Sequence, residues 1–379
     1  MTPDVAVVGL GAMGSATTYA LAQRGVRVIG IDRFAPPHDH GSSHGESRVI
    51  RMAYFEDPAY VPLLRLAFEH WHRLESRTGE RVLTVTGILE AGHKGSALVE
   101  GSVRSAVQHG LPHEVLRPSE VNRRIPAFSL PDDWDCVFQP DAGVLRPEKA
   151  MHLFLSAAQA LGAQCHLNTA VKSVRPVADH AEVQLESGEI VEAGSVVVCA
   201  GPWIPELVPE LRSHLVLTRQ PLVWFRPRDQ ELVRAERMPI FFLQTRDDLV
   251  YGFPDLFGTG VKAASHLTGD VLSGAGAPRA EATDEEKVRL WRFMRRYIPA
   301  AAGDPYRSTT CIYTRAPDGH FLLGLHPRHP QIVIASPCSG HGFKFASVIG
   351  EVLADLATRR TTDKPIDLFS PGRFCRASI

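Results

Sequence analysis

Residues 5–14 read VAVVGLGAMG, a short apolar run that leads into three glycines spaced as G-x-G-x-x-G. In this fingerprint Gly9 makes a tight turn, Gly11 lets backbone N–H groups approach a pyrophosphate, and Gly14 packs a helix against a strand. A helical pattern follows over residues 12–23, and a second apolar run completes the unit. The order strand, glycine turn, helix, strand predicts a βαβ unit that holds the ADP half of a dinucleotide cofactor.

The second apolar run, residues 26–31, ends at Asp32. A carboxylate at this point accepts hydrogen bonds from ribose hydroxyls and repels a 2′-phosphate. We therefore expect Asp32, with the neighbouring Arg33, to contact the cofactor, and we exclude NADP. NAD and FAD both remain open on these residues alone.

The length and charge of the chain indicate a two-domain protein with a small-molecule partner. A chain of 379 residues exceeds what one hydrophobic core usually serves, so we expect two domains or one with an inserted layer. Its 41 basic and 42 acidic side chains nearly cancel, so no net field attracts nucleic acid or an anionic membrane. Without a secretory signal in residues 1–9 or an apolar run of roughly 18 residues, we expect a cytoplasmic protein.

The sequence offers no clear metal or disulfide framework. Its six cysteines are scattered without a Cys-x-x-Cys pair. Three histidines, His38, His40 and His44, share a polar loop at residues 36–48, but their spacing is irregular and no cysteine or carboxylate cluster joins them. We expect no metal, and we interpret this segment as a functional loop beside the cofactor.

The remaining pattern divides into an α/β part and a strand-rich part. A charged helix lies within the strand-rich part, and a strand and a helix then return the chain to the first part. Helices are expected at 63–74, 148–161, 284–297 and 343–356, and strands or strand-rich runs at 82–89, 171–177, 181–185, 195–201, 215–225, 240–253 and 331–335.

Three positive side chains stand out by their surroundings. Arg48 and Arg51 end the polar loop, and on a helical turn they would share a face and bind a carboxylate or phosphate. Lys344 opens the last helix, where it opposes the helix dipole and therefore predicts an anionic ligand. Gly340 and Gly342, just before it, can present backbone N–H groups to an anionic atom such as the carbonyl region of a reduced flavin.

Two further side chains leave more than one interpretation open. Lys262 lies among small and apolar residues, which favours a buried or cleft-facing ammonium. Cys311 lies in a strand-like run, where a cysteine is by default a small buried hydrophobe.

These motifs resemble those of the monomeric sarcosine oxidase and N-methyltryptophan oxidase family, within the D-amino-acid-oxidase-like flavoproteins. They occur in the same order as in that family, along almost the whole chain. The matching motifs are Gly9-x-Gly11-x-x-Gly14, Pro36-Pro37-His38, Ser43-His44-Gly45-Glu46-Ser47-Arg48 with Arg51, Tyr251-Gly252-Phe253-Pro254, Lys262 with His266, Cys311-Ile312-Tyr313-Thr314, and Ser339-Gly340-His341-Gly342-Phe343-Lys344-Phe345.

The resemblance implies an α/β (α+β) fold, in which a Rossmann-like FAD-binding domain carries an inserted, mostly antiparallel substrate domain. We assign residues 1–82, 143–214 and 318–379 to the FAD-binding domain, and residues 83–142 and 215–317 to the substrate domain.

By the same resemblance, FAD is the cofactor and Cys311 carries it as a thioether. His44, Ser47 and Arg48 would lie near the flavin ring. Lys262 would face the other side of the ring and stabilise the superoxide or peroxide that forms as O₂ is reduced.

The resemblance also implies a substrate site. Arg51 and Lys344, itself also near the cofactor, would hold the substrate carboxylate. Tyr251, His266 and Tyr313 would line the amine pocket, and Phe242 and Tyr313 would contact the substrate. The residues expected to act in catalysis are Lys262, Arg48, His266 and Tyr251.

The implied reaction oxidises CH–NH of sarcosine or another N-methyl amino acid to C=N, water hydrolyses the imine, and O₂ becomes H₂O₂. The expected enzyme is a monomer. An oxidase of cyclic imino acids, such as pipecolate-, proline- or piperideine-carboxylate-like rings, is the alternative. A flavin- or nucleotide-binding module needs neither Lys262 nor Cys311 in these roles, and an NAD-dependent dehydrogenase would show no flavin absorption.

Four positions differ from what the resemblance leads one to expect. Ser47 replaces a threonine and keeps its hydroxyl. Phe55 stands where the sarcosine enzymes have glycine before the acid, here Glu56; Cys338 replaces an apolar or aromatic residue, and Phe242 is bulkier than usual. The last three lie where the substrate side chain would sit, so they bear on which amine is oxidised rather than on the chemistry.

Overall fold

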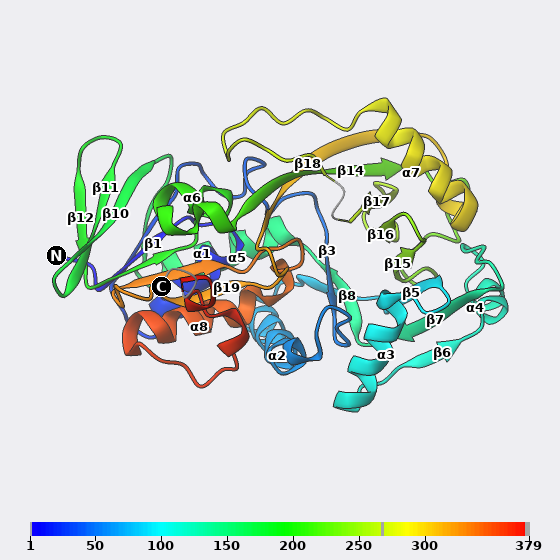
Figure 1. Ribbon diagram of the computed structural model, residues 1–379, viewed down its shortest axis with the longest axis horizontal. Coiled ribbons are helices and arrows are strands. Elements are labelled where there is room, and N and C mark those ends of the chain that lie inside the picture. The colour runs from blue at the N-terminus through cyan, green and yellow to red at the C-terminus, as the bar shows by residue number, and fades with distance from the viewer. Residues whose placement is uncertain (1, 267–268, 376–379) are drawn as a thin grey trace.

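A six-stranded sheet carries the glycine motif in the computed structural model, which describes residues 2–266 and 269–375 (Figure 1). Its strand order is β19-β20-β13-β1-β2-β9, and all neighbours are parallel except β19 and β20. Every residue of β1 and β13 is buried, as expected where both faces of a parallel sheet are covered. The strands are β1 (Val5–Val8), β2 (Val28–Ile31), β9 (Gln164–His166), β13 (Ser195–Val198), β19 (Leu322–Leu325) and β20 (Ile332–Ser336).

Helices cover one face of this sheet. Helix α1 (Ala12–Gln23) packs against α5 (Pro147–Ala160) and α8 (Ala346–Arg359), and α2 (Val61–Thr78) packs against α8. Their apolar side chains share one core with those of β1 and β20. The expected helices of this layer are therefore present, although the last one begins with a 3₁₀ turn, Phe343–Phe345, before α8.

A small antiparallel sheet covers the opposite face. It consists of β10 (Val171–Val177), β11 (His180–Leu185) and β12 (Ile190–Ala193) and packs with α6 (Ile204–Leu207) on the large sheet. The predicted hairpin at 171–185 is its first part.

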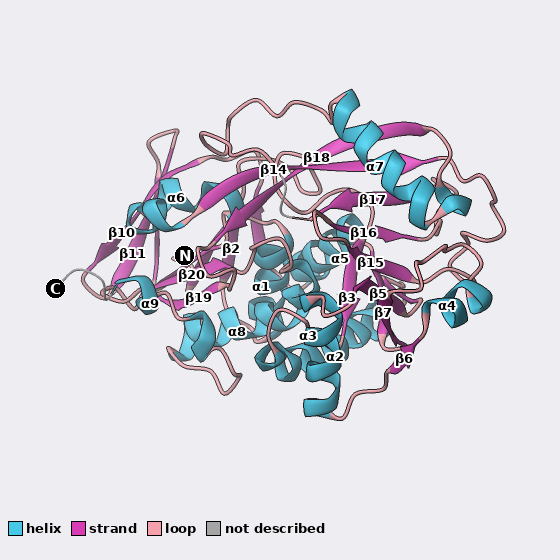
Figure 2. Cartoon of the chain, turned by 45° about the vertical axis from the view of Figure 1, so that its right-hand side comes forward, coloured by secondary structure: helices cyan, strands magenta, loops and turns pink. Residues whose placement is uncertain are grey.

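An eight-stranded sheet forms the second layer (Figure 2). Its order is β18-β14-β17-β16-β15-β5-β7-β6, and all neighbours are antiparallel except β15 and β5. Its elements are β5 (Ile88–His93), β6 (Glu114–Leu116), β7 (Trp134–Gln139), β14 (Val216–Phe225), β15 (Ile240–Gln244), β16 (Leu249–Phe253), β17 (Val261–Ser265) and β18 (Pro305–Arg315), with helices α3 (Ala97–His109), α4 (Pro118–Arg124) and α7 (Asp284–Tyr297) beside it.

This arrangement confirms the predicted fold class, a Rossmann-like sheet with a mostly antiparallel second layer. The second layer is built from two separate stretches of the chain, and its long strands β14 and β18 reach back towards the first layer (Figure 1). A short helix, α9 (Gly372–Cys375), lies near the end of the described chain. Within the described ranges, no helix combines the length and apolar character needed to cross a membrane.

A fourth sheet, with three strands, corrects two predictions. It contains β3 (Arg48–Arg51), β4 (Leu83–Val85) and β8 (Ala142–Leu145), with β8 in the middle. The expected single strand at 82–89 is therefore two strands, β4 and β5, because the chain turns at Gly87, whose φ is +68°. The expected helical turn at Arg48 and Arg51 is also wrong: both lie on a strand, where side chains three residues apart point to opposite faces.

Candidate active site

A cavity starts at the carboxyl ends of β1 and β2 and continues between the two layers. Its volume is about 1770 Å³, including the solvent space at its mouth. Its lining residues run from the glycine motif to Lys344, so the predicted ADP-binding end and the predicted substrate end belong to one cavity. Most of the predicted site residues line it: Gly9, Gly11, Asp32, Arg33, Ser47, Arg48, Arg51, Phe242, Tyr251, His266, Cys311, Tyr313, Gly340, Gly342 and Lys344. Gly14, His44 and Lys262 do not.

The glycine motif fits a pyrophosphate at one end of the cavity. Gly9 has a φ of +90°, and a Cβ on Gly14 would lie 1.7 Å from the Gly9 carbonyl oxygen, so neither position accepts another side chain. A Cβ on Gly11 would meet only the Ser43 hydroxyl, at 3.6 Å. The middle glycine thus leaves space at the amino terminus of α1, where anions bind well.

Asp32 lies at the carboxyl end of β2, where ligands of open α/β sheets bind. Its carboxylate accepts hydrogen bonds from the backbone N–H groups of Leu10 (2.6 Å) and Phe34 (2.8 Å). These bonds fix the carboxylate at the cavity wall. Arg33 lies beside it, with its guanidinium 5.8 Å from the centre of the Trp203 ring.

Cys311 lies on β18 at the middle of the cavity, and the polar loop closes over it. Its Sγ is 3.5 Å from the Ser42 carbonyl oxygen and 3.7 Å from Arg48 Nη2. Arg48 also donates to the carbonyl oxygens of Ser42 and Ser47. The buried Cys311 thiol therefore faces a cationic side chain within the part of the cavity that both layers share.

His44, within this loop, is buried and does not line the cavity. Burial, and secondarily the charge of Arg48, lower the pKa of His44 to about 3, so its ring is neutral at pH 7. Among the described residues, no partner reaches its Nε2.

Lys262 lies on β17, behind the residues that line the cavity. Its Nζ donates to the carbonyl oxygens of Gly45 (2.7 Å) and Ser47 (2.9 Å) and lies 4.4 Å from the centre of the Phe253 ring. Burial, followed by the charge of Arg48, holds the pKa of Lys262 well below its usual range. Of the two positions that the sequence left open for this side chain, buried or cleft-facing, the structure has the buried one.

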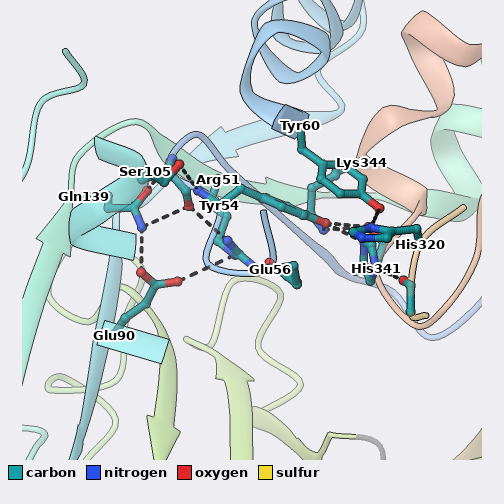
Figure 3. Close-up of polar contacts among 12 residues, drawn as sticks. Arg51, Tyr54, Glu56, Tyr60, Glu90, Ser105, Gln139, His320, His341 and Lys344 are labelled. Atoms are coloured by element: carbon teal, nitrogen blue, oxygen red, sulfur yellow. Dashed lines mark hydrogen bonds and ion pairs between the residues drawn. The ribbon is translucent and has the colours of Figure 1, made fainter. Parts of the chain in front are cut away.

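At the far end of the cavity, Arg51 is shared between two carboxylates (Figure 3). Its Nη2 donates to Glu56 (2.6 Å), and its Nε lies 3.6 Å from Glu90 on β5. Burial raises the pKa of Glu56, but Arg51 outweighs this effect and brings it to about 2. For Glu90 burial prevails over Arg51 and raises the pKa to about 7.

Lys344 supplies the second cation at this end (Figure 3). Its Nζ donates to the carbonyl oxygen of His341 (2.7 Å) and to the hydroxyl of Tyr54 (3.2 Å). Burial and then the nearby Arg51 lower the pKa of Lys344 to about 7. Two cations therefore face the same end of the cavity, as expected for a site that holds an anion.

Aromatic side chains form the walls between these cations and Cys311. The Tyr251 ring centre lies 5.7 Å from that of Phe242 and 6.2 Å from that of His266, and the Tyr251 and Tyr313 hydroxyls are 3.4 Å apart. Burial lowers the pKa of His266 to about 4 and raises that of Tyr313 far above its usual range. These walls are uncharged at neutral pH.

Sequence reasoning missed Glu90 and Gln139, the amide that donates to Glu90 (2.6 Å). Neither belongs to a motif, and they come from different strands of the second layer. A usable signal did exist, because Glu90 is a single charged residue in the apolar run Ile88–Gly92. Fully buried carboxylates are rare unless they are paired.

Comparisons with known proteins agree with this geometry. The chain matches the family described as DAO, FAD dependent oxidoreductase, over residues 4–356. It is 40% identical to a monomeric sarcosine oxidase of Streptomyces avermitilis, with 99% of each chain covered, and 33% identical to an N-methyl-L-tryptophan oxidase of Yersinia pestis, with 99% of this chain and 100% of the relative covered. A solved structure of NikD, an unusual amino acid oxidase essential for nikkomycin biosynthesis, superposes with a TM-score of 0.87 at 26% identity over 98% of this chain and 97% of the other. The chain thus belongs to this family of FAD-dependent oxidoreductases, and FAD is its cofactor.

Proposed function

We propose that the protein oxidises the CH–NH bond of an N-methyl amino acid, sarcosine or a larger relative, to an imine and passes the electrons to O₂, which leaves as H₂O₂. The main support for this proposal is the pair of cations, Arg51 and Lys344, at the end of an aromatic cavity that otherwise fits FAD. A secondary amine beside a carboxylate matches this combination of charge and shape.

The cavity residues divide between the two ends of FAD. Gly9, Gly11 and Asp32 would hold its ADP half, and Cys311 would be joined to its ring as a thioether. When bound, FAD supplies the two-electron acceptor for the C–H bond. The buried position of Cys311 in the cavity wall, beside Arg48, supports the tether.

The substrate carboxylate would replace Glu56 on Arg51. Glu56 lines the cavity and its side chain is 18% exposed, whereas the side chain of Glu90 is fully buried. Glu56 can therefore give way to a ligand while Glu90 stays in place. Lys344, beside the same space, would contribute the second charge-assisted contact.

The pocket would also keep the amine neutral, which oxidation requires. Apolar surroundings and nearby cations lower the pKa of an amine. The neutral rings of Tyr251, His266 and Tyr313 provide the first, and Arg51 and Lys344 provide the second. No separate strong base is needed at this position.

Lys262 would assist the reduction of O₂. A desolvated ammonium stabilises the negative charge that develops on oxygen. Its place behind Ser47 and Phe253, both of which line the cavity, supports this role. The proposal also includes the two domains with the residue ranges given above, which limited proteolysis tests. It further includes a monomeric enzyme, which size-exclusion chromatography tests, and a location in the cytoplasm, which cell fractionation tests.

A screen of H₂O₂ release tests the proposed reaction. The purified holoenzyme is supplied with sarcosine, other N-methyl amino acids, pipecolate and proline at equal concentrations. We expect kcat/KM to be highest for an N-methyl amino acid. A higher value for pipecolate or proline would replace the proposal with a cyclic imino acid oxidase, and no turnover with any of them would leave only a flavin-binding protein.

A further inference from the structure

The turn at Gly45–Ser47 is held from two sides by opposite charges. On one side, Glu148 Oε1 accepts hydrogen bonds from the backbone N–H groups of Gly45 (2.7 Å) and Glu46 (3.1 Å). On the other side, Lys262 Nζ donates to the carbonyl oxygens of Gly45 and Ser47. The polar groups of one turn therefore lie between a carboxylate and a buried ammonium.

The conformation of this turn depends on such support. Gly45 and Glu46 both have positive φ values, +99° and +70°, and for a glutamate this backbone conformation is unfavourable. The side chain of Glu46 is also fixed, because it accepts from Trp224 Nε1 (3.2 Å) and pairs with Arg307 (2.5 Å). Ser47, the last residue of the turn, and the adjacent Arg48 line the cavity.

Glu148 comes from a different element, the first turn of α5, where a carboxylate is already favoured by the helix dipole. Its side chain contacts the turn instead of remaining in solvent. We infer that Glu148 is a positioning residue for Lys262: it fixes the Gly45–Ser47 turn whose carbonyl groups hold the ammonium, and it places a negative charge on the other side of that turn. This inference rests on the proposed role of Lys262 in O₂ reduction.

The charges around Lys262 make the direction of the effect clear. Arg48 on β3 disfavours its protonated form, and Glu148 and Glu46 favour it. Removing the charge of Glu148 should therefore lower the pKa of Lys262, so that the ammonium is lost at a lower pH. The titratable or charged groups that face Lys262 are Arg48 from β3, Glu148 from α5, His44 and Glu46 from the loop, and Cys311 from β18.

The variant Glu148→Gln tests this inference, because its amide oxygen can still accept from the turn. The holoenzyme is reduced with dithionite without O₂ and mixed with O₂, and flavin absorbance follows reoxidation from pH 6 to pH 10. We expect the pH at which the reoxidation rate falls by half to decrease by about one unit or more, as for loss of a nearby charge. Anaerobic reduction by substrate should change less than twofold.

Glu75→Gln is the matched control, because Glu75 Oε1 also accepts from two consecutive N–H groups, those of Val82 and Leu83, away from Lys262. It should leave the reoxidation profile unchanged. Glu148→Asp, which keeps the charge on a shorter side chain, should shift the profile less than Glu148→Gln does. Hydrogen exchange gives a readout without turnover: in Glu148→Ala, which removes the acceptor as well as the charge, the amides of the peptide that covers 45–47 should exchange at least tenfold faster than in wild type.

The outcomes separate this inference from the proposed function. If Lys262→Met is reoxidised as fast as the wild type, the oxygen role fails and the inference fails with it. If Lys262→Met is slow but Glu148→Gln keeps the wild-type pH profile, or Glu148→Ala keeps the wild-type amide exchange, only the inference is overturned. Equal slowing of both half-reactions in Glu148→Gln, or a Glu75→Gln profile that shifts as far, also overturns it, as does a Glu148→Asp profile shifted as far as that of Glu148→Gln.

Discussion

Arg51 is surrounded by aromatic rings as well as carboxylates. Its guanidinium carbon lies 4.3 Å from the centre of the Tyr54 ring and 4.6 Å from that of Phe55, and the side chain is 1% exposed. An arginine so far from water keeps its charge only with partners, which Glu56 and Glu90 supply. Arg51 is thus held in its charged form at this end of the cavity by its two carboxylate partners.

The pH dependence of carboxylate binding follows from Lys344. Because its pKa lies at about 7, its charge is present below pH 7 and lost above it. A bound carboxylate favours the protonated form, so the affinity for acetate should fall as pH rises through 7. We expect flavin difference spectra to show this decrease in wild type and weaker, nearly pH-independent binding in Lys344→Met. If the affinity of Lys344→Met for acetate falls with pH as much as that of the wild type, the titrating group is Glu90 instead, whose pKa is also about 7.

The proposed tether at Cys311 is testable by colour. After acid precipitation of the wild type, the yellow colour should remain in the protein pellet. In Cys311→Ser it should wash into the supernatant, while Cys338→Ser, which alters another thiol of the same cavity, should behave as wild type. Colour that washes free from the wild-type pellet would contradict the tether.

Single residues were predictable from sequence where a motif gave their surroundings. The cationic pair Arg51 and Lys344 could be expected in this way. That Arg51 is also paired with Glu90 could not, because Glu90 lies 39 positions further along and no local pattern connects the two. Lys262 shows a related limit: its burial was predictable, whereas its place behind the turn depends on how β17 meets the loop.

At the scale of elements, the glycine turn depends on very close packing of α1 on β1. The Cβ of an alanine at Gly14 would lie 1.7 Å from the Gly9 carbonyl oxygen, so α1 would have to move away from the strand. Overpacking of this kind typically costs about 1–3 kcal/mol. We expect Gly14→Ala to lower the free energy of unfolding by at least this amount and to reduce the FAD content, as measured by denaturation and by absorbance.

Gly274→Ala is the control for that experiment, because a Cβ at Gly274 has no heavy atom within 4 Å. It should retain the stability and FAD content of the wild type. A Gly14→Ala protein as stable and as yellow as the wild type would contradict the packing role of this glycine.

Elements with strong periodicity were predictable, and the boundaries set by tertiary contacts were not. The helix at 12–23 and the helix at 284–297 have the expected bounds, because apolar spacing or a capping box at Thr283 defines them locally. The run 82–89 has the pattern of one strand, but the chain turns at Gly87 and its two halves join different sheets. Arg48–Arg51 forms a strand because β8 pairs with it.

At the scale of the whole molecule, the site exists only where the two layers meet. The glycine motif belongs to the six-stranded sheet, and Cys311 and Lys262 belong to the eight-stranded sheet. Lys344 lies in the 3₁₀ turn that precedes α8. The sequence order of these motifs could be compared with a family, and this predicted the fold class. The distances across the cavity required the assembled layers, because they join residues up to about 300 positions apart.

The most direct test of the central claim is the stoichiometry of turnover with the best N-methyl amino acid from the screen. O₂ consumption, H₂O₂ and formaldehyde are measured in the same reaction of the purified holoenzyme. Oxidation of the N-methyl group predicts equal amounts of all three, with the demethylated amino acid as the other product. Substrate oxidation without O₂ consumption and H₂O₂, or H₂O₂ release without formaldehyde, would contradict it.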